Sequence, residues 1–180
     1  MNREIKFRGQ RIDNKEWVCG FFVGNYNPSK VENEVQDYFI YEGLKNLSNL
    51  IPVIPESVGQ FIEEKDESGK EIYEDDIVDI CVFLVSPSNP DYDEHYRGVI
   101  SFEGGWMFNI VSYIDYRNGG TVIPIQSKHL PFYEAELDED GTFSVSLFAF
   151  MGLSGNLGEF LDDNIKIIGS IHETPSFLTK

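Results

Sequence analysis

Alternation of hydrophobic and polar residues is the dominant pattern along this chain. In EIKFRGQRI, which begins at Glu4, Ile5 and Phe7 fall on one side of an extended chain, and Lys6 and Arg8 fall on the other. A period of two is that of a strand with one buried face. The pattern therefore predicts that the chain begins with a half-buried strand.

A second strand is predicted at EWVCGFFVG, residues 16–24, after a turn at residues 13–15. Its apolar residues lie on both sides, which is typical of a strand buried on both faces, and Gly20 indicates a bulge or a close backbone approach. The two segments predict an N-terminal β-hairpin. In IPVIP, Pro52 and Pro55 cannot donate backbone hydrogen bonds, so this segment is expected to be an edge strand or an extended connector.

The rest of the chain also reads as strand after strand. Five β-rich segments, which begin at residues 76, 97, 119, 141 and 164, are DIVDICVFLV, RGVISFEGGWMFNIVSYI, GGTVIPI, GTFSVSLFAFM and NIKIIGSIH. Turn-forming residues separate them, so a mostly antiparallel β fold is predicted. Two short helices are expected, at residues 42–50 and 156–163. A soft boundary near Phe61 divides the chain into an N-terminal β subdomain, residues 1–61, and a second subdomain, residues 62–180, packed as one compact unit.

The net charge of the chain limits the classes of partner that it can bind. The 180 residues include 31 acidic and 14 basic residues, a formal net charge of −17, which repels polyanions and disfavours nucleic acid. Ten carboxylates lie between Glu56 and Asp79, whereas the first 17 residues hold five basic and three acidic side chains. The N-terminus has no signal-like apolar stretch and no run approaches the ~20 apolar residues that span a bilayer. A cytoplasmic location is expected.

The acidic stretch KDESGKEIYEDDIVDI, residues 65–80, raises the question of a metal site. Its spacing does not fit a calcium loop, because Gly69 comes too early. ELDEDGTFSVSL fits better until its last position, where Leu147 replaces the bidentate Glu, and a hairpin turn on its DG is the favoured interpretation. In the acidic stretch itself, we expect Asp66 and Asp76 to accept backbone N–H bonds within turns. We also expect Gly69 to supply a positive φ, and Tyr73 and Ile77 to pack inward.

Three segments and the N-terminus together resemble one known family. They are similar to the YopX family, which is encoded by bacteriophages and prophages. The three segments are VIPESVGQF, EKDESGKEIYEDDIV and IKIIGSIHETPSFL, and the N-terminal one is REIKFRG. Members of that family typically have an IP-E-VGQF segment, a KD-NGK-IYEGDIV segment and a terminal EVIGNIYENPEL segment. The likeness touches both ends and the middle of the chain, while residues 28–43 and 83–163 carry little of it.

The resemblance implies a mostly β fold that contains a small, partly open SH3-like β-barrel with few short helices. It implies no enzymatic activity, because none is established for the family. One departure concerns Asp75, which stands where the family usually has Gly. A turn that needs positive φ tolerates Asp better than most residues, at some cost in strain.

Residues that could carry chemistry are few. His95, His129 and His172 form no metal-binding motif and flank strands or turns, so we expect surface or edge positions for them and no metal or cofactor. Cys19 and Cys81 show no electropositive context that would make a nucleophile. Residues 152–158, GLSGNLG, lack the Lys and Ser/Thr of a phosphate loop. No catalytic, metal or cofactor-binding residue is predicted, and no binding residue can be named.

Four aromatic residues, Trp106, Phe108, Tyr113 and Tyr116, lie near Arg97 and Arg117 in the sequence. They could stack bases or grip a peptide, but filling the core is the favoured interpretation. Our leading hypothesis is therefore a non-enzymatic phage or prophage accessory protein that binds a host or phage protein through an acidic β surface. Self-association through the N-terminal hairpin is also expected. The alternatives are a nucleic-acid-binding module that uses the basic hairpin and the aromatics, and a hydrolase with dispersed carboxylates.

Overall fold

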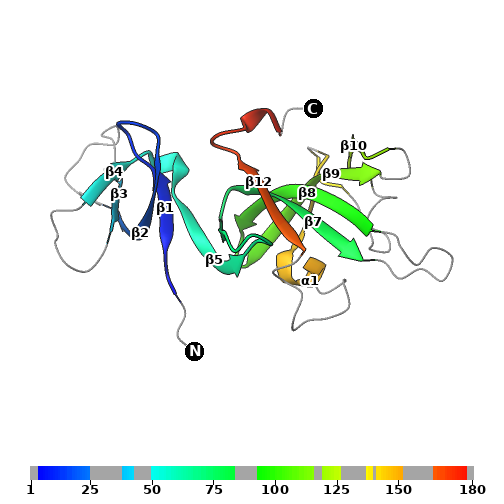
Figure 1. The fold of residues 1–180 in the computed structure, drawn as a ribbon, viewed down its shortest axis with the longest axis horizontal. Coiled ribbons are helices and arrows are strands. Elements are labelled where there is room, and N and C mark those ends of the chain that lie inside the picture. The colour runs from blue at the N-terminus through cyan, green and yellow to red at the C-terminus, as the bar shows by residue number, and fades with distance from the viewer. Residues whose placement is uncertain are drawn as a thin grey trace. The chain divides into compact units, whose positions relative to one another are not determined.

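The computed structural model describes residues 4–24, 38–42, 50–83, 93–115, 119–126, 137–139, 141–151 and 164–177. Within these residues the protein is mostly β, with two antiparallel sheets and one α-helix (Figure 1). The prediction of a mostly antiparallel β fold is confirmed. The chain divides into two compact units, residues 1–63 and 64–180. The boundary expected from sequence, near Phe61, lies two residues before this division.

The first sheet has the strand order β4-β3-β2-β1-β5-β6. Its strands are β1 (Phe7–Gln10), β2 (Trp17–Gly24), β3 (Tyr38–Tyr41), β4 (Leu50–Val53), β5 (Gly59–Lys65) and β6 (Glu71–Tyr73), and a 3₁₀ turn, η1 (Pro55–Ser57), follows β4. β1 and β2 form the predicted N-terminal hairpin. β4 contains Pro52 and ends the strand order, as expected for IPVIP, but backbone bonds also link it to the end of β1. The Ile54 N–H donates to the Gln10 carbonyl at 2.8 Å and the Ile12 N–H donates to the Pro52 carbonyl at 3.2 Å.

One face of this sheet forms the core of the first unit. Val18, Ile40 and Val53 are buried there. Arg11 and Val53 form an isolated antiparallel bridge, so the sheet curls and brings the end of β1 to β4. A Cβ atom at Gly20 would lie 2.2 Å from the backbone oxygen of the facing strand, so this position needs glycine, as expected for a close backbone approach.

The second sheet has the order β10-β9-β8-β7-β12, and β11 also pairs with β9. Its strands are β7 (Asp76–Phe83), β8 (Asp93–Phe102), β9 (Trp106–Asp115), β10 (Thr121–Pro124), β11 (Phe143–Ser146) and β12 (Ile165–Ser170). All five segments predicted as β-rich contribute strands. The order is that of an open sheet, and the SH3-like barrel stays a prediction.

A helix replaces the end of one predicted strand. We expected GTFSVSLFAFM to be extended throughout, but after β11 the chain forms α1 (Leu147–Met151). Leu147, Phe150 and Met151 are buried, and their i, i+3, i+4 spacing places them on one helix face, whereas Phe148 is 44% exposed. The Phe150 ring packs 5.2 Å from the rings of Tyr96 and Phe108. Tertiary burial therefore overrides the strand pattern here.

The helix expected at residues 156–163 lies outside the described residues. So do residues 43–49 of the other expected helix, and Leu50, its last residue, belongs to β4. A second 3₁₀ turn, η5 (Pro175–Phe177), lies near the end of the chain. Among the described residues, no helix is both long and apolar enough to cross a membrane.

The acidic stretch forms two turns, as predicted. Asp66 Oδ1 accepts the backbone N–H groups of Ser68 and Lys70, each at 2.9 Å. The Tyr73 N–H donates to Asp76 Oδ2 at 2.9 Å. Gly69 has a φ of +81°. Tyr73 and the following Ile77 are both buried.

At the position where the resembling family has glycine, Asp75 has a φ of +67°. Its carbonyl oxygen accepts the Ile171 N–H at 3.1 Å, and its own N–H donates to the Ile100 carbonyl at 2.9 Å. Its carboxylate lies 2.9 Å from His172 Nε2. The surrounding bonds therefore hold the strained turn in place.

Candidate functional site

Strand pairing in the second sheet gathers polar side chains on one face. In the register of β7 and β8, Asp79 lies opposite Arg97 and Cys81 lies opposite His95. Lys166 of β12 lies opposite Asp79 on the other side. Directly opposed residues share a sheet face, so an acid, three basic side chains and a thiol lie together on three neighbouring strands.

Asp79 is the centre of this arrangement. Its Oδ1 lies 2.7 Å from His95 Nδ1, and its Oδ2 accepts a hydrogen bond from Arg97 Nε at 2.8 Å. The Asp79 side chain is 10% exposed, and those of His95 and Arg97 are 26% and 27% exposed. We call these three residues, with Cys81, the β7–β8 cluster.

The electrostatics of the cluster favour the charged form of each partner. Burial opposes ionisation of Asp79, but hydrogen bonds from His95 and Arg97 outweigh it and lower the pKa of this carboxyl. The hydrogen bond with Asp79, followed by one with Cys81, raises the pKa of His95 to about 10. At neutral pH the imidazole is therefore protonated, so it is a hydrogen-bond donor and a local positive charge.

One expectation about these residues is corrected. His95 lies within β8, between two strands of the sheet, rather than beside a strand or at an edge, and its side chain is 26% exposed. Cys81, for which no nucleophilic role is predicted, faces the imidazole of His95. Alternation in DICVF and EHYRG places Asp79 with Cys81, and His95 with Arg97, on one side of each strand, but only the register brings the two pairs together.

The other candidates take structural positions. His172 is only 16% exposed and its Nε2 lies 2.9 Å from the Asp75 carboxylate, which corrects the expected surface position. His129 lies outside the described residues. Cys19 is partly exposed and faces Arg8 across the hairpin. No group of three or more His, Cys, Asp or Glu side chains placed to hold a metal ion occurs in the described ranges.

The aromatic residues fill the core, as favoured from sequence. Trp106, Phe108 and Tyr113 are at most 6% exposed, and Tyr116 lies outside the described residues, as does Arg117. These three rings are not available for stacking on a base.

The basic hairpin is less available for phosphates than its sequence suggested. Arg8, expected to point away from the buried face, is 6% exposed and its guanidinium lies 4.3 Å from the centre of the Trp17 ring. Arg11 donates two hydrogen bonds to the Asp13 carboxylate. Ile5, expected on the buried side, is 56% exposed. Arg8 lies on the side of β1 away from Phe7, as expected, and the cation–π contact with Trp17 covers its guanidinium.

The first sheet leaves its second face open. Two cross-strand rows run over β2, β3 and β4, and their six side chains are all apolar: Phe21, Tyr41 and Leu50 in one row, and Val23, Phe39 and Pro52 in the other. Phe21 is 51% exposed, Val23 40% and Leu50 39%. Within one copy of the chain, only one face of EWVCGFFVG is therefore buried. We call these six residues the open face.

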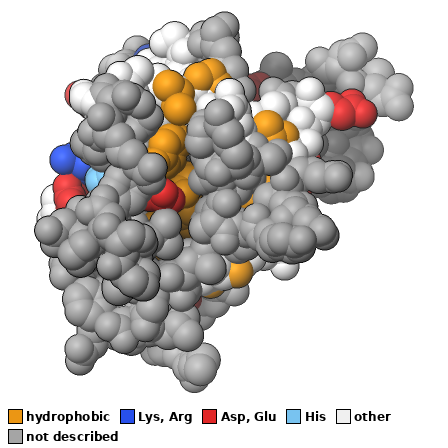
Figure 2. Space-filling model, turned by 90° about the vertical axis from the view of Figure 1, so that its right-hand side faces the viewer, with side chains coloured by type: hydrophobic (Ala, Val, Ile, Leu, Met, Phe, Trp, Pro, Cys, Tyr) orange, Lys and Arg blue, Asp and Glu red, His pale blue; other side chains and the backbone are white. Residues whose placement is uncertain are grey.

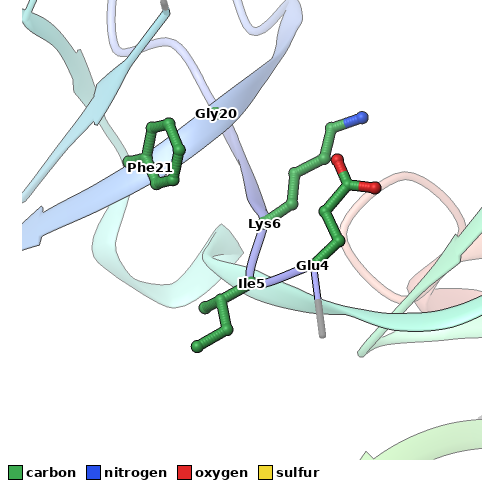
Figure 3. A pocket seen from close by; sticks show the side chains of 5 residues that line it. All are labelled: Glu4, Ile5, Lys6, Gly20 and Phe21. Carbon is green, nitrogen blue, oxygen red and sulfur yellow. The ribbon is translucent and has the colours of Figure 1, made fainter. Parts of the chain in front are cut away.

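A hollow of about 370 Å³ extends the open face at Phe21. It is lined by Glu4, Ile5, Lys6, Gly20 and Phe21 (Figure 3). Figure 3 shows the Glu4 and Lys6 side chains extending to the same side, away from Ile5. The polar ends of these residues therefore leave Ile5 as further exposed apolar surface beside the open face.

Acidic side chains do not gather in the same way on the face that Figure 2 shows. Among the described residues drawn there, they are scattered, and hydrophobic side chains are visible between residues that are not described. Basic, acidic and histidine side chains lie together at the left edge of this view.

Comparison of the chain with protein-family models, with curated proteins and with solved structures found no match in any of the three. The likeness to the YopX family stays a prediction that rests on the quoted motifs.

Proposed function

We propose that this protein is non-enzymatic and acts by binding protein, with the open face as its docking surface. The observation that carries the proposal is the two rows of six apolar side chains, which include no charged residue. Contiguous exposed apolar surface of this kind is typical of interaction sites. The role expected from the resemblance, a cytoplasmic accessory protein of a phage or prophage, is part of the same proposal.

The occupant that we propose is a second copy of the chain. Residues 1–63 carry seven basic and nine acidic side chains, a net charge of −2, whereas residues 64–180 carry seven basic and 22 acidic side chains, a net charge of −15. Two copies that meet through their first units repel each other far less than two that meet through their second units. In a two-fold dimer, an uncharged apolar face is buried in both copies at once.

The test is the oligomeric state of a charged variant and its matched control. Phe21→Glu places a carboxylate on the open face, and Phe148→Glu makes the same change at a residue of similar exposure in the second unit. We expect wild type and Phe148→Glu to associate with rising concentration in sedimentation velocity. Phe21→Glu should weaken association by roughly 100-fold or more, because an unpaired carboxylate in an apolar interface loses its hydration.

Salt gives a second readout. Because both copies are acidic, added sodium chloride should screen their repulsion and strengthen association. A wild type that is monomeric at every concentration and ionic strength would contradict the proposal. So would a folded Phe21→Glu variant that associates as strongly as wild type.

A further inference from the structure

The β7–β8 cluster has the composition of a nucleophilic thiol site. Cys81 and His95 are directly opposed on neighbouring antiparallel strands, where Cβ atoms lie about 4.5–5.5 Å apart. The His95 ring is fixed by its 2.7 Å contact with Asp79, which Arg97 holds from the other carboxylate oxygen. Thiol, imidazolium and carboxylate thus form a series of nucleophile, neighbouring cation and orienting group.

Among the described side chains of these strands, four charged groups lie near the thiol. On β7 and β8 they are Asp79, His95 and Arg97, and on β12 it is Lys166, whose Nζ lies 3.2 Å from Glu67 Oε1. The facing residues of β9, Ser112 and Ile114, carry no charge. Of these groups, His95 is the one directly opposite Cys81.

We propose that Cys81 is a nucleophilic thiol and the site at which this protein is covalently modified by small, soft electrophiles. Cys81 is partly exposed, so such a reagent can reach it. The imidazolium of His95 stabilises negative charge on the sulfur, as in other cysteine sites that lie next to a protonated histidine. This inference does not rest on the proposed binding function, because it concerns a different sheet.

Alkylation by iodoacetamide illustrates the step. A lone pair of the thiolate sulfur forms the new carbon–sulfur bond, the carbon–iodine bond breaks and iodide leaves with its electron pair. The thiol proton passes to the buffer, because the His95 imidazole is already protonated at neutral pH, and no oxidant is required.

The chain supplies its own reference in Cys19. This thiol is also partly exposed and also faces a cation, Arg8, but the Arg8 guanidinium is stacked on the Trp17 ring. We would treat the native protein with iodoacetamide at neutral pH and follow both cysteines by peptide mass spectrometry. Cys81 should react roughly tenfold faster than Cys19, because the imidazolium of His95 stabilises the negative charge that the attacking sulfur carries.

The variant His95→Gln keeps a polar side chain but removes the imidazolium. If it is folded by circular dichroism, the Cys81 rate should fall to within about twofold of the Cys19 rate. Equal rates of the two cysteines in the wild type would overturn the proposal, and so would an undiminished Cys81 rate in folded His95→Gln.

If His95→Gln does not fold, the two rates in the wild type decide. A Cys81 rate no faster than the Cys19 rate would show that His95 does not activate Cys81, and the proposal would be wrong.

Discussion

The two sheets differ in what their second face carries. Each has one face that packs into a core, around Ile40 in the first unit and around Phe108 in the second. The other face of the first sheet is apolar and exposed, as at Phe21. The corresponding face of the second sheet holds ionised side chains that bind one another, with Asp79 at the centre. The same β pattern thus serves a docking surface in one unit and a polar cluster in the other.

Charge follows the same division. The first unit is nearly neutral and the second carries most of the excess acid. An exposed apolar face is a liability for solubility, and strong net charge opposes association. The comparison indicates that association and solubility depend on different units. The first unit favours contact with another molecule, and the charge of the second unit opposes it.

The largest loss of stability is expected from a substitution in the core of the second unit. Phe150→Ala removes a fully buried ring that contacts Tyr96 and Phe108, and should lower the free energy of unfolding by about 3–5 kcal/mol. Phe148→Ala on the same helix removes a ring that is 44% exposed and should cost far less. Urea unfolding followed by circular dichroism measures both. Equal losses would mean that α1 does not pack by the face described.

A smaller loss is expected when the polar cluster is broken. Asp79→Ala leaves His95 and Arg97 without the carboxylate that binds both, and should destabilise the protein by about 2 kcal/mol. The control is Asp13→Ala, which breaks the exposed pair with Arg11 in the first unit and should cost much less, because solvent screens an exposed ion pair. Chemical denaturation of both variants at pH 6 measures the two losses. If Asp79→Ala lowers the free energy of unfolding no more than the control does, Asp79 does not stabilise the fold.

The contribution of His95 should depend on pH in a definite direction. Because the folded state raises the pKa of His95 to about 10, the unfolded chain loses this proton first as pH rises. The stabilisation is therefore complete below the ordinary pKa near 6.5 and is lost progressively up to about 10. The difference in unfolding free energy between wild type and Asp79→Ala should be smaller at pH 10 than at pH 6. A difference that grows with pH would show that His95 is neutral in the fold.

The smallest effects compare two turns with positive φ. Lys15, in the first unit, is exposed and has a φ of +63°, so Lys15→Gly should stabilise the protein by up to about 1 kcal/mol. Asp75→Gly relieves similar strain in the second unit but loses the contact with His172, so little or no gain is expected. Thermal melts of the two variants test this difference in stability. An equal rise in melting temperature for both variants would contradict it.

Local patterns were sufficient for much of the fold. Period-two alternation predicts the N-terminal hairpin and the strands of the second sheet, because it reflects burial of one face, which is a local property of an extended chain. The turn chemistry of Asp66 and Gly69 was also predictable, since their bonds and backbone angles involve neighbouring residues. The same local reasoning failed at α1, where a helix buries Leu147 and Phe150 better than a strand would.

What the sequence by itself determined is therefore the β character of the chain, its turns, its uneven charge and which side chains share a side of each strand. Only the tertiary structure decided which strands are neighbours and in what register, because pairing depends on contacts between residues far apart in sequence. Register brings Asp79 to His95 and Arg97, and Cys81 to His95. Curling of the first sheet leaves Phe21 on the outside although its strand is apolar on both sides. Both the open face and the β7–β8 cluster are products of that pairing.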